Sequence, residues 1–205
     1  MSVKTARRTV NDELVAVGRD GINGMNRSIG NITTDHDRII SEYFLKLPGN
    51  ATVLNLGCGP GGTATMAMRL ALRGDRLLVA VDINMRHILM AREGIQHRRG
   101  CITGYVCADA RQLGVRDESI DLIVALGLFW GVTSDQSGKH DSWLTVLHEC
   151  RRVLRRNQSM FVSNSAVRES VAVFRALCND AGFQEDRLVE DAVGATDPRY
   201  LMVLR

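Results

Sequence analysis

The 205-residue sequence is poor in proline, has no long hydrophobic run and carries no strong excess of charge of either sign. Its three prolines and its hydrophobic fraction of 45% exclude a disordered or collagen-like chain. A chain of this size buries about 70% of the surface that it exposes when unfolded, so it needs no metal or disulfide staple in order to fold. We therefore expect one globular protein.

Cysteine is also sparse. Five cysteines are scattered along the chain, at positions 58, 101, 107, 150 and 178. Their number is odd, no two of them form a CxxC pair, and none lies beside a histidine at metal-ligand spacing. We therefore expect reduced thiols in a cytoplasmic protein, with neither a disulfide framework nor a metal site.

The charge and the hydrophobic pattern argue against two kinds of partner. A formal net charge of +3 is too small for a dedicated nucleic-acid binder, and we interpret the arginines of 151–156 as a solvated helix face. The longest apolar run, residues 122–132, is too short to cross a bilayer. No apolar core of a secretory signal follows the basic residues near the N-terminus. We expect no membrane contact, and the sequence leaves the oligomeric state open, a homodimer included.

What the chain does contain is an alternation of short apolar runs with helix-length amphipathic stretches, which predicts βαβ units around a parallel sheet. Strands are expected at 51–57, 76–82, 103–109, 119–126, 159–163, 183–193 and 199–204, and helices at 34–47, 63–74, 85–98, 142–155 and 167–181. The last two strands would form an antiparallel edge. Residues 51–205 would thus be one doubly wound α/β domain, and residues 1–50 a helical segment that acts as a lid.

Ligands of open α/β sheets bind beyond the carboxyl ends of the strands, so the residues that follow each predicted strand are the candidates for a site. The first strand is followed by GCGPGG at 57–62, where glycines permit a tight turn and close approach of a ligand to the backbone. Asp82 ends the second strand, 25 positions beyond Gly57, and suits the two hydroxyls of a ribose. Asp109 follows the third strand and LGLFWGV the fourth.

Taken singly, each of these features fits more than one role. Gly57, Gly59 and Gly62 also satisfy the GxGxxG pattern of nicotinamide dinucleotide sites, or could form a turn that binds nothing. Asp82 could cap the helix at 85–98, and Asp109 could be a solvated loop acid. It is their combination that favours a nucleoside-binding site.

VLNLGCGPGG, VAVD, CADA, SIDLIVALG and HECRRVLRRNQSMFVS resemble, in order and spacing, the successive motifs of class I S-adenosylmethionine-dependent methyltransferases. The resemblance covers about residues 39–205. It implies a Rossmann-like fold with a seven-stranded, mostly parallel sheet, an antiparallel last strand and helices on both faces. It also implies S-adenosylmethionine as cofactor and S-adenosylhomocysteine as product.

The same resemblance suggests which residues hold the cofactor. The glycine loop would lie under its methionine part, the acid of the second strand would hold the ribose, and the acid after the third strand would meet the adenine amino group. The residues so assigned are Gly57, Cys58, Gly59 and Gly61 in the loop, Asp82 with Ile83, Asp109 with Ala110, and Leu126 on the methionine side. The family usually has an acid where this chain has Asn55, which we expect to bond the cofactor ammonium with a modest loss of affinity.

The acceptor side is less defined. Methyl transfer is an in-line displacement that depends mainly on proximity, and a base is needed only for a protonated amine or a hydroxyl acceptor. Candidate catalytic residues are His140 and Asp141, and candidate acceptor-binding residues are His36, Phe129, Trp130 and Trp143. A solvated loop or a helix N-terminus would account for His140 and Asp141, and helix N-terminal charge would account for His36. Packing of a loop onto a helix would account for the aromatic residues equally well.

No insertion follows the fifth predicted strand, which favours a small-molecule acceptor over a macromolecule. The sequence therefore predicts a small-molecule methyltransferase. Two alternatives stay open. One is an enzyme that uses the same cofactor without moving its methyl, by cyclisation or aminocarboxypropyl transfer that releases methylthioadenosine, at which Asn55 hints. The other is a nicotinamide-dependent or non-catalytic nucleotide-binding domain.

Overall fold

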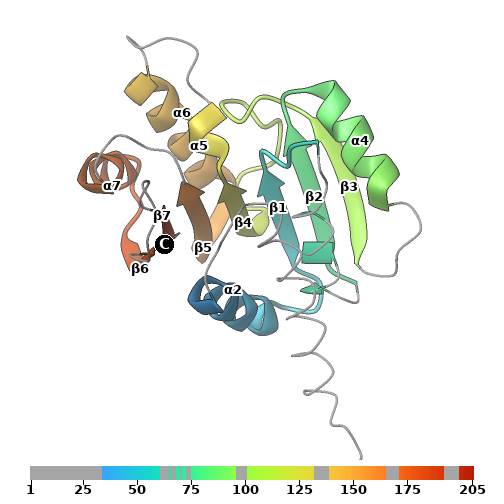
Figure 1. Ribbon diagram of the computed structural model, residues 1–205, viewed down its shortest axis with the longest axis horizontal. Helices are drawn as coiled ribbons and strands as arrows, with labels where there is room; N and C mark the ends of the chain where they lie inside the picture. The colour runs from blue at the N-terminus through green and yellow to red at the C-terminus, as the bar shows by residue number, and fades with distance from the viewer. Residues whose placement is uncertain are drawn as a thin grey trace, which may run out of the picture.

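A computed structural model describes residues 34–60, 75–95, 101–131, 139–164, 171–191 and 199–205, together with positions 65, 68, 69, 71 and 72. These residues form a seven-stranded sheet in the order β3-β2-β1-β4-β5-β7-β6 (Figure 1). The strands are β1 (Thr52–Leu56), β2 (Leu77–Asp82), β3 (Ile102–Cys107), β4 (Ile120–Leu126), β5 (Leu154–Asn164), β6 (Glu185–Asp191) and β7 (Arg199–Leu204). The helices are α2 (Thr34–Lys46), α4 (Met85–Ile95), α5 (Leu128–Gly131), α6 (Lys139–Val153) and α7 (Val171–Asp180).

The topology is the one expected from the sequence. β3, β2, β1, β4 and β5 pair in parallel, whereas β7 is antiparallel to both of its neighbours, β5 and β6. The central strand β4 reads IDLIVAL, and its first six residues are buried. Such a continuous apolar run is typical of a strand that is covered on both faces.

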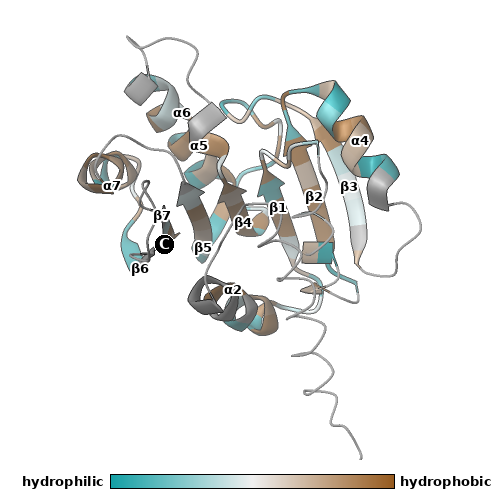
Figure 2. Ribbon diagram, viewed as in Figure 1, coloured by the Kyte–Doolittle hydropathy of each residue, from teal (hydrophilic) through white to brown (hydrophobic). Residues whose placement is uncertain are grey.

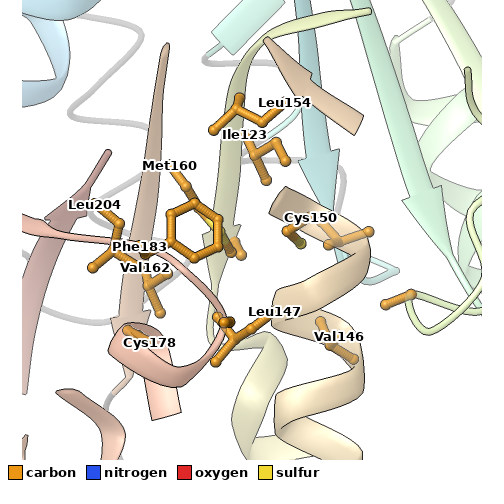
Figure 3. Packing of buried hydrophobic residues seen from close by; sticks show 14 of the residues in the cluster. Ile123, Val146, Leu147, Cys150, Leu154, Met160, Val162, Cys178, Phe183 and Leu204 are labelled. Carbon is orange, nitrogen blue, oxygen red and sulfur yellow. The ribbon is translucent and has the colours of Figure 1, made fainter. Parts of the chain in front are cut away.

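Alternate side chains of the central strands β1, β4 and β5 enter two separate clusters, one on each face of the sheet. On the first face, Ile123, Met160 and Val162 pack against Val146, Leu147 and Cys150 of α6 and Cys178 of α7 (Figure 3). On the second face, Val53, Leu122 and Phe161 pack against Ile39, Ile40 and Phe44 of α2. The sheet is therefore the middle layer of a three-layer molecule.

The helix α2 belongs to the same core as the sheet, because Ile39, Ile40 and Phe44 are at most 3% exposed. Figure 1 shows α2 below the sheet, whereas the arrowheads of β1, β4 and β5 point upward, toward α5. Of the lid predicted for residues 1–50, the part formed by α2 is therefore a core helix. Residues 1–33 lie outside the described part of the chain.

The helix α4 covers the second face over β2 and the edge strand β3. Its residues Ile88 and Ala91 are buried against Ala80 of β2 and Cys58 of the glycine loop. Figure 2 shows both hydrophilic and hydrophobic stretches along α4, as expected of an amphipathic helix. The buried stripe of α4 thus holds the glycine loop against β2.

The boundary between α6 and β5 differs from the sequence prediction. The helix begins at Lys139 rather than Ser142 and ends at Val153, and β5 begins directly at Leu154 rather than at Ser159. Asn157 has a φ of 62°, and the register with β4 shifts between Ile120 and Leu122. The polar RRNQ segment is therefore a bulged part of the strand, which apolar periodicity does not reveal.

Candidate active site

A cavity of about 650 Å³ lies where four of the parallel strands end. Every predicted strand-end motif contributes to its wall. Its described lining consists of Leu56, Gly57 and Gly59 at the end of β1, Val81, Asp82, Ile83, Asn84 and His87 at the end of β2 and the start of α4, Ala108, Asp109, Ala110 and Arg111 after β3, Gly127 and Leu128 after β4, and Ser142 of α6. Segments far apart in the sequence thus meet in one place, as the strand-end rule predicts.

The glycine turn after β1 is fixed to the end of β2. The N–H groups of Gly57 and Cys58 both donate to the carbonyl oxygen of Val81, over 2.8 and 3.0 Å. Gly57 has a φ of 74°, and a Cβ at this position would come within 2.9 Å of the Leu128 Cδ1 atom. The turn therefore requires glycine for both its backbone conformation and its close contact.

The Asp82 carboxylate binds three other parts of the cavity wall. Its Oδ2 accepts a hydrogen bond from the Gly59 N–H over 2.9 Å, and its Oδ1 accepts one from the Asn84 N–H over 2.9 Å. The Nδ1 atom of His87 lies 3.2 Å from the same Oδ1. Asp82 thus orients the glycine turn and the start of α4 at once.

Asp82 is not the cap of α4, although its place before the helix also allowed that role. The cap is Asn84, whose Oδ1 accepts the Arg86 N–H over 3.0 Å at the start of the helix. Sequence reasoning missed both Asn84 and His87. An Asn directly before a predicted helix was the available signal for the former.

The Asp109 carboxylate is held by a neighbour that sequence reasoning also missed. The Arg111 guanidinium donates to both of its oxygens, over 3.0 Å from Nε and 2.6 Å from Nη2. This pairing keeps the pKa of Asp109 below its usual range. Asp109 is therefore a charged, oriented group of the cavity rather than a free loop acid.

The loop that carries Asp109 is anchored to α6 by charged groups. Residues 108–119 are all described and contain no helix. The Glu149 carboxylate accepts the Leu113 N–H over 2.7 Å and the Arg152 Nη2–H over 2.6 Å, and Arg152 also donates to the Val115 carbonyl over 2.8 Å. A further contact joins Arg152 to Asp117. This network connects the α6 helix with the wall of the cavity.

Three residues expected at the cofactor are absent from the described lining of the cavity. Asn55 is 2% exposed, and its amide donates to the Thr65 hydroxyl over 2.8 Å, so it does not line the cavity. The side chain of Cys58 packs under α4, where burial raises the pKa of its thiol to about 12. The side chain of Leu126 joins the cluster on the α2 face. The backbone at the end of β4, which was expected on the methionine side, lines the cavity at Gly127. Gly61 lies outside the described residues.

The aromatic residues of the expected acceptor wall are core residues. Phe129 and Trp143 are 0% and 1% exposed, and their ring centroids lie 5.8 Å apart in an edge-on arrangement. Phe129 also packs edge-on against Phe174 of α7, at 5.0 Å. The prediction that Phe129 and Trp143 bind the acceptor is therefore wrong, because their apolar surface joins α5, α6 and α7 together.

The remaining acceptor-side predictions fall at the edge of what the structure describes. Asp141 is exposed in the first turn of α6, and the next residue, Ser142, lines the cavity in its place. The side chains of His36, Trp130 and His140 lie outside the described part of the chain.

In the described part, no three His, Cys, Asp or Glu side chains are grouped as metal ligands would be. No described helix has the length and apolar composition of a membrane span.

The fold and the cavity together define a doubly wound α/β protein with a nucleoside-type site beyond its strands. The family model of the Methyltransferase domain matches residues 54–162, which is more than half of the chain, so the chain belongs to the methyltransferase domain family. Its cofactor is S-adenosylmethionine. The site fits this group: the glycine turn leaves its backbone open, Asp82 offers a carboxylate, and Ile83 presents a side chain that is 66% exposed.

Solved structures share the fold at low sequence identity. A SAM-dependent methyltransferase from Leishmania major is 14% identical, with a TM-score of 0.63 over 95% of this chain and 74% of its own. A TehB-like SAM-dependent methyltransferase from Corynebacterium glutamicum is 17% identical, with a TM-score of 0.63 over 95% and 98%. The [4+2]-cyclase SpnF is 15% identical, with a TM-score of 0.60 over 82% and 80%. No curated protein matches the sequence.

Proposed function

We propose that the protein transfers the methyl group of S-adenosylmethionine to a small-molecule acceptor by in-line displacement. The observation that carries this proposal is the cavity at the strand ends, which unites the glycine turn with Asp82 and Asp109. Its volume of about 650 Å³ lies in the range of small-molecule sites.

In this proposal, the lining residues after β1, β2 and β3 each bind a different part of the cofactor. Asp82 binds the ribose diol, Ile83 packs on the adenine, and Asp109 faces the adenine amino group. Gly57 and Gly59 let the methionine part approach the backbone. The support for these roles is that all five residues line the cavity.

The acceptor would enter from the side of β4 and α6. There the described lining consists of Gly127, Leu128 and Ser142, whereas the charged lining residues follow β2 and β3. A wall of this kind supplies proximity and excludes water, which is the main requirement of methyl transfer. When bound, S-adenosylmethionine supplies an electrophilic methyl group. Where the acceptor needs a base, His140 and Asp141 remain the candidates.

The first experiment is a calorimetric titration of the purified protein with S-adenosylmethionine, S-adenosylhomocysteine and NAD. We expect micromolar binding of both sulfur compounds and none of NAD. A screen of small nucleophiles, read by mass spectrometry, would then identify the acceptor by a mass gain of one methyl group. A folded protein that binds NAD, or neither sulfur compound, would contradict the proposal.

A second candidate function uses the same cofactor without methyl transfer, by cyclisation or aminocarboxypropyl transfer. It is favoured by one observation, that the Asn55 amide is bonded to Thr65 instead of facing the cavity as the family acid would. Handling of the amino acid arm would then differ from that of a methyltransferase. Product analysis separates the two functions, because this one releases methylthioadenosine and the first releases S-adenosylhomocysteine.

A further inference from the structure

The His87 imidazole takes part in the cavity without a role in the function proposed above. It is in the first turn of α4, it lines the cavity, and its side chain is 33% exposed. Its Nδ1 atom lies 3.2 Å from the Asp82 Oδ1 atom. An ionised carboxylate only accepts hydrogen bonds, so the imidazole nitrogen that faces Asp82 must carry the hydrogen.

This contact is not needed for the local fold of α4. Asn84 already caps the helix, by accepting the Arg86 N–H. The Ile88 N–H donates to the Asn84 carbonyl over 3.2 Å, which closes the first turn. The His87 side chain is therefore free of any capping duty, and its described hydrogen-bond contact is to the carboxylate of the cavity.

The number of hydrogen bonds that the Asp82 carboxylate can accept suggests what His87 contributes to the site. A carboxylate has about four lone-pair positions. Three of them face protein donors, namely the N–H groups of Gly59 and Asn84 and the Nδ1–H of His87. About one position is left for a ligand, whereas a ribose diol brings two hydroxyl donors.

We propose that His87 is a specificity-determining residue of the cofactor site, which completes the recognition of the ribose diol. Its Nδ1–H fixes the Asp82 carboxylate, which accepts one hydroxyl. In the neutral ring, its Nε2 is then an acceptor, and it takes the second hydroxyl. This inference rests on the proposed binding of the ribose at Asp82, and it adds a residue to that site.

The test compares three ligands, S-adenosylhomocysteine and its 2′-deoxy and 3′-deoxy analogues, by calorimetry. We expect the native protein to bind each analogue about fivefold to tenfold more weakly than the parent compound, the effect of one net hydrogen bond. In His87→Phe, binding of the parent compound should weaken by a similar factor, because the phenyl ring has no Nε2 and covers the Oδ1 position that Nδ1 occupied. One of the two analogues should then bind as well as the parent, because its missing hydroxyl has lost its partner.

Two further variants make the result specific. The amide nitrogen of His87→Asn occupies the place of Nδ1 and keeps the contact with Asp82 but lacks Nε2, so it should lose discrimination for the same single hydroxyl while binding the parent better than His87→Phe. His148→Phe changes an exposed histidine of α6 outside the cavity and should leave all three affinities unchanged. Melting temperatures of all variants verify that they are folded.

The outcomes separate the inference from the proposed function. If the native protein binds the parent but ignores both deoxy changes, the ribose does not bind at Asp82, so the role of His87 and the ribose role of Asp82 both fail, whereas the proposed methyl transfer stands. If the native protein and both His87 variants discriminate equally, only the role of His87 is overturned. A ¹⁵N spectrum of the ligand-free protein in alkaline buffer adds a readout independent of binding: we expect the Nδ1–H tautomer of His87, and the Nε2–H tautomer would contradict the inference.

Discussion

At the scale of single residues, the carboxylate of Asp82 links the glycine turn, the start of α4 and the cavity. It receives the Gly59 and Asn84 N–H groups, each over 2.9 Å. A side chain bonded on this many sides has one orientation, so its remaining acceptor position points to a fixed place in the cavity. Preorganisation of this kind strengthens binding, because the ligand does not have to order the group.

Replacement of Asp82 by Ala should weaken binding of S-adenosylhomocysteine at least tenfold, or about 1.4 kcal/mol, because both a ligand contact and the anchor of Gly59 are lost. Calorimetry measures the effect. Asp180→Asn, an exposed change at the end of α7, serves as the control and should bind like the native protein. Unchanged affinity in Asp82→Ala would exclude the ribose role of this residue.

Gly57→Ala should destabilise the protein by about 1–3 kcal/mol, because the new Cβ must adopt a left-handed φ and also meets Leu128. Urea denaturation gives the free energy of unfolding. In Gly49→Ala the added Cβ has no neighbour within 4 Å and no strained φ, so this variant should stay within about 0.5 kcal/mol of the native protein. Equal stability of the two variants would show that the turn relaxes without loss.

At the scale of the elements, the loop of residues 108–119 has no helix and depends on charged groups of α6 for its position. The Arg152 guanidinium lowers the pKa of Glu149, which also holds the Leu113 N–H. A carboxyl group whose pKa is depressed in the folded state stabilises that state above its unfolded pKa of about 4.3, and this contribution is lost as the pH falls through the folded pKa.

Glu149→Gln should therefore lower the free energy of unfolding by about 1–3 kcal/mol at pH 7, and the difference from the native protein should shrink as the pH falls below about 4. Urea denaturation over this pH range measures it. Glu118→Gln removes an exposed partner of Arg156 and should change stability by less than about 1 kcal/mol. A difference for Glu149→Gln that is independent of pH would contradict the ionic origin of the effect.

Much of the element order was predictable, because it depends on local patterns. The apolar runs of β1, β2 and β4 and the final pair of strands follow from hydrophobic periodicity, and the strand-end rule then brings Asp82 and Asp109 together. Contacts between side chains of different elements were not predictable in this way. The Thr65 partner of Asn55 and the burial of Trp143 against Phe174 depend on packing across elements, which spacing along the chain does not encode.

At the scale of the whole molecule, the N-terminal segment and the sheet share one hydrophobic cluster. Phe44 of α2 is 3% exposed within it, and Tyr43 packs edge-on against Phe161 of β5 at 5.0 Å. The Tyr43 hydroxyl also donates to Asp186 over 2.7 Å. These contacts indicate that α2 is a structural part of the domain.

Phe44→Ala should therefore destabilise the whole protein by about 3 kcal/mol or more, since it removes a fully packed aromatic ring. Leu45→Ala, its neighbour with a side chain 54% exposed, should change stability by at most about 0.5 kcal/mol. Chemical denaturation of both variants measures the contrast. A small effect at Phe44, with α2 amides that exchange hydrogen faster than those of the sheet, would indicate a helix that opens by itself.

The position of β7 between β5 and β6 has a consequence for the order in which the chain can assemble. Among the described strands, β6 pairs only with β7, which follows it in the sequence. During synthesis, β6 therefore emerges before it has any strand to join, and one edge of β5 stays open until β7 arrives. The parallel half of the sheet, β1 to β5, can form earlier, so closure of the β5 edge is the late, long-range step of folding and the period of greatest exposure to aggregation.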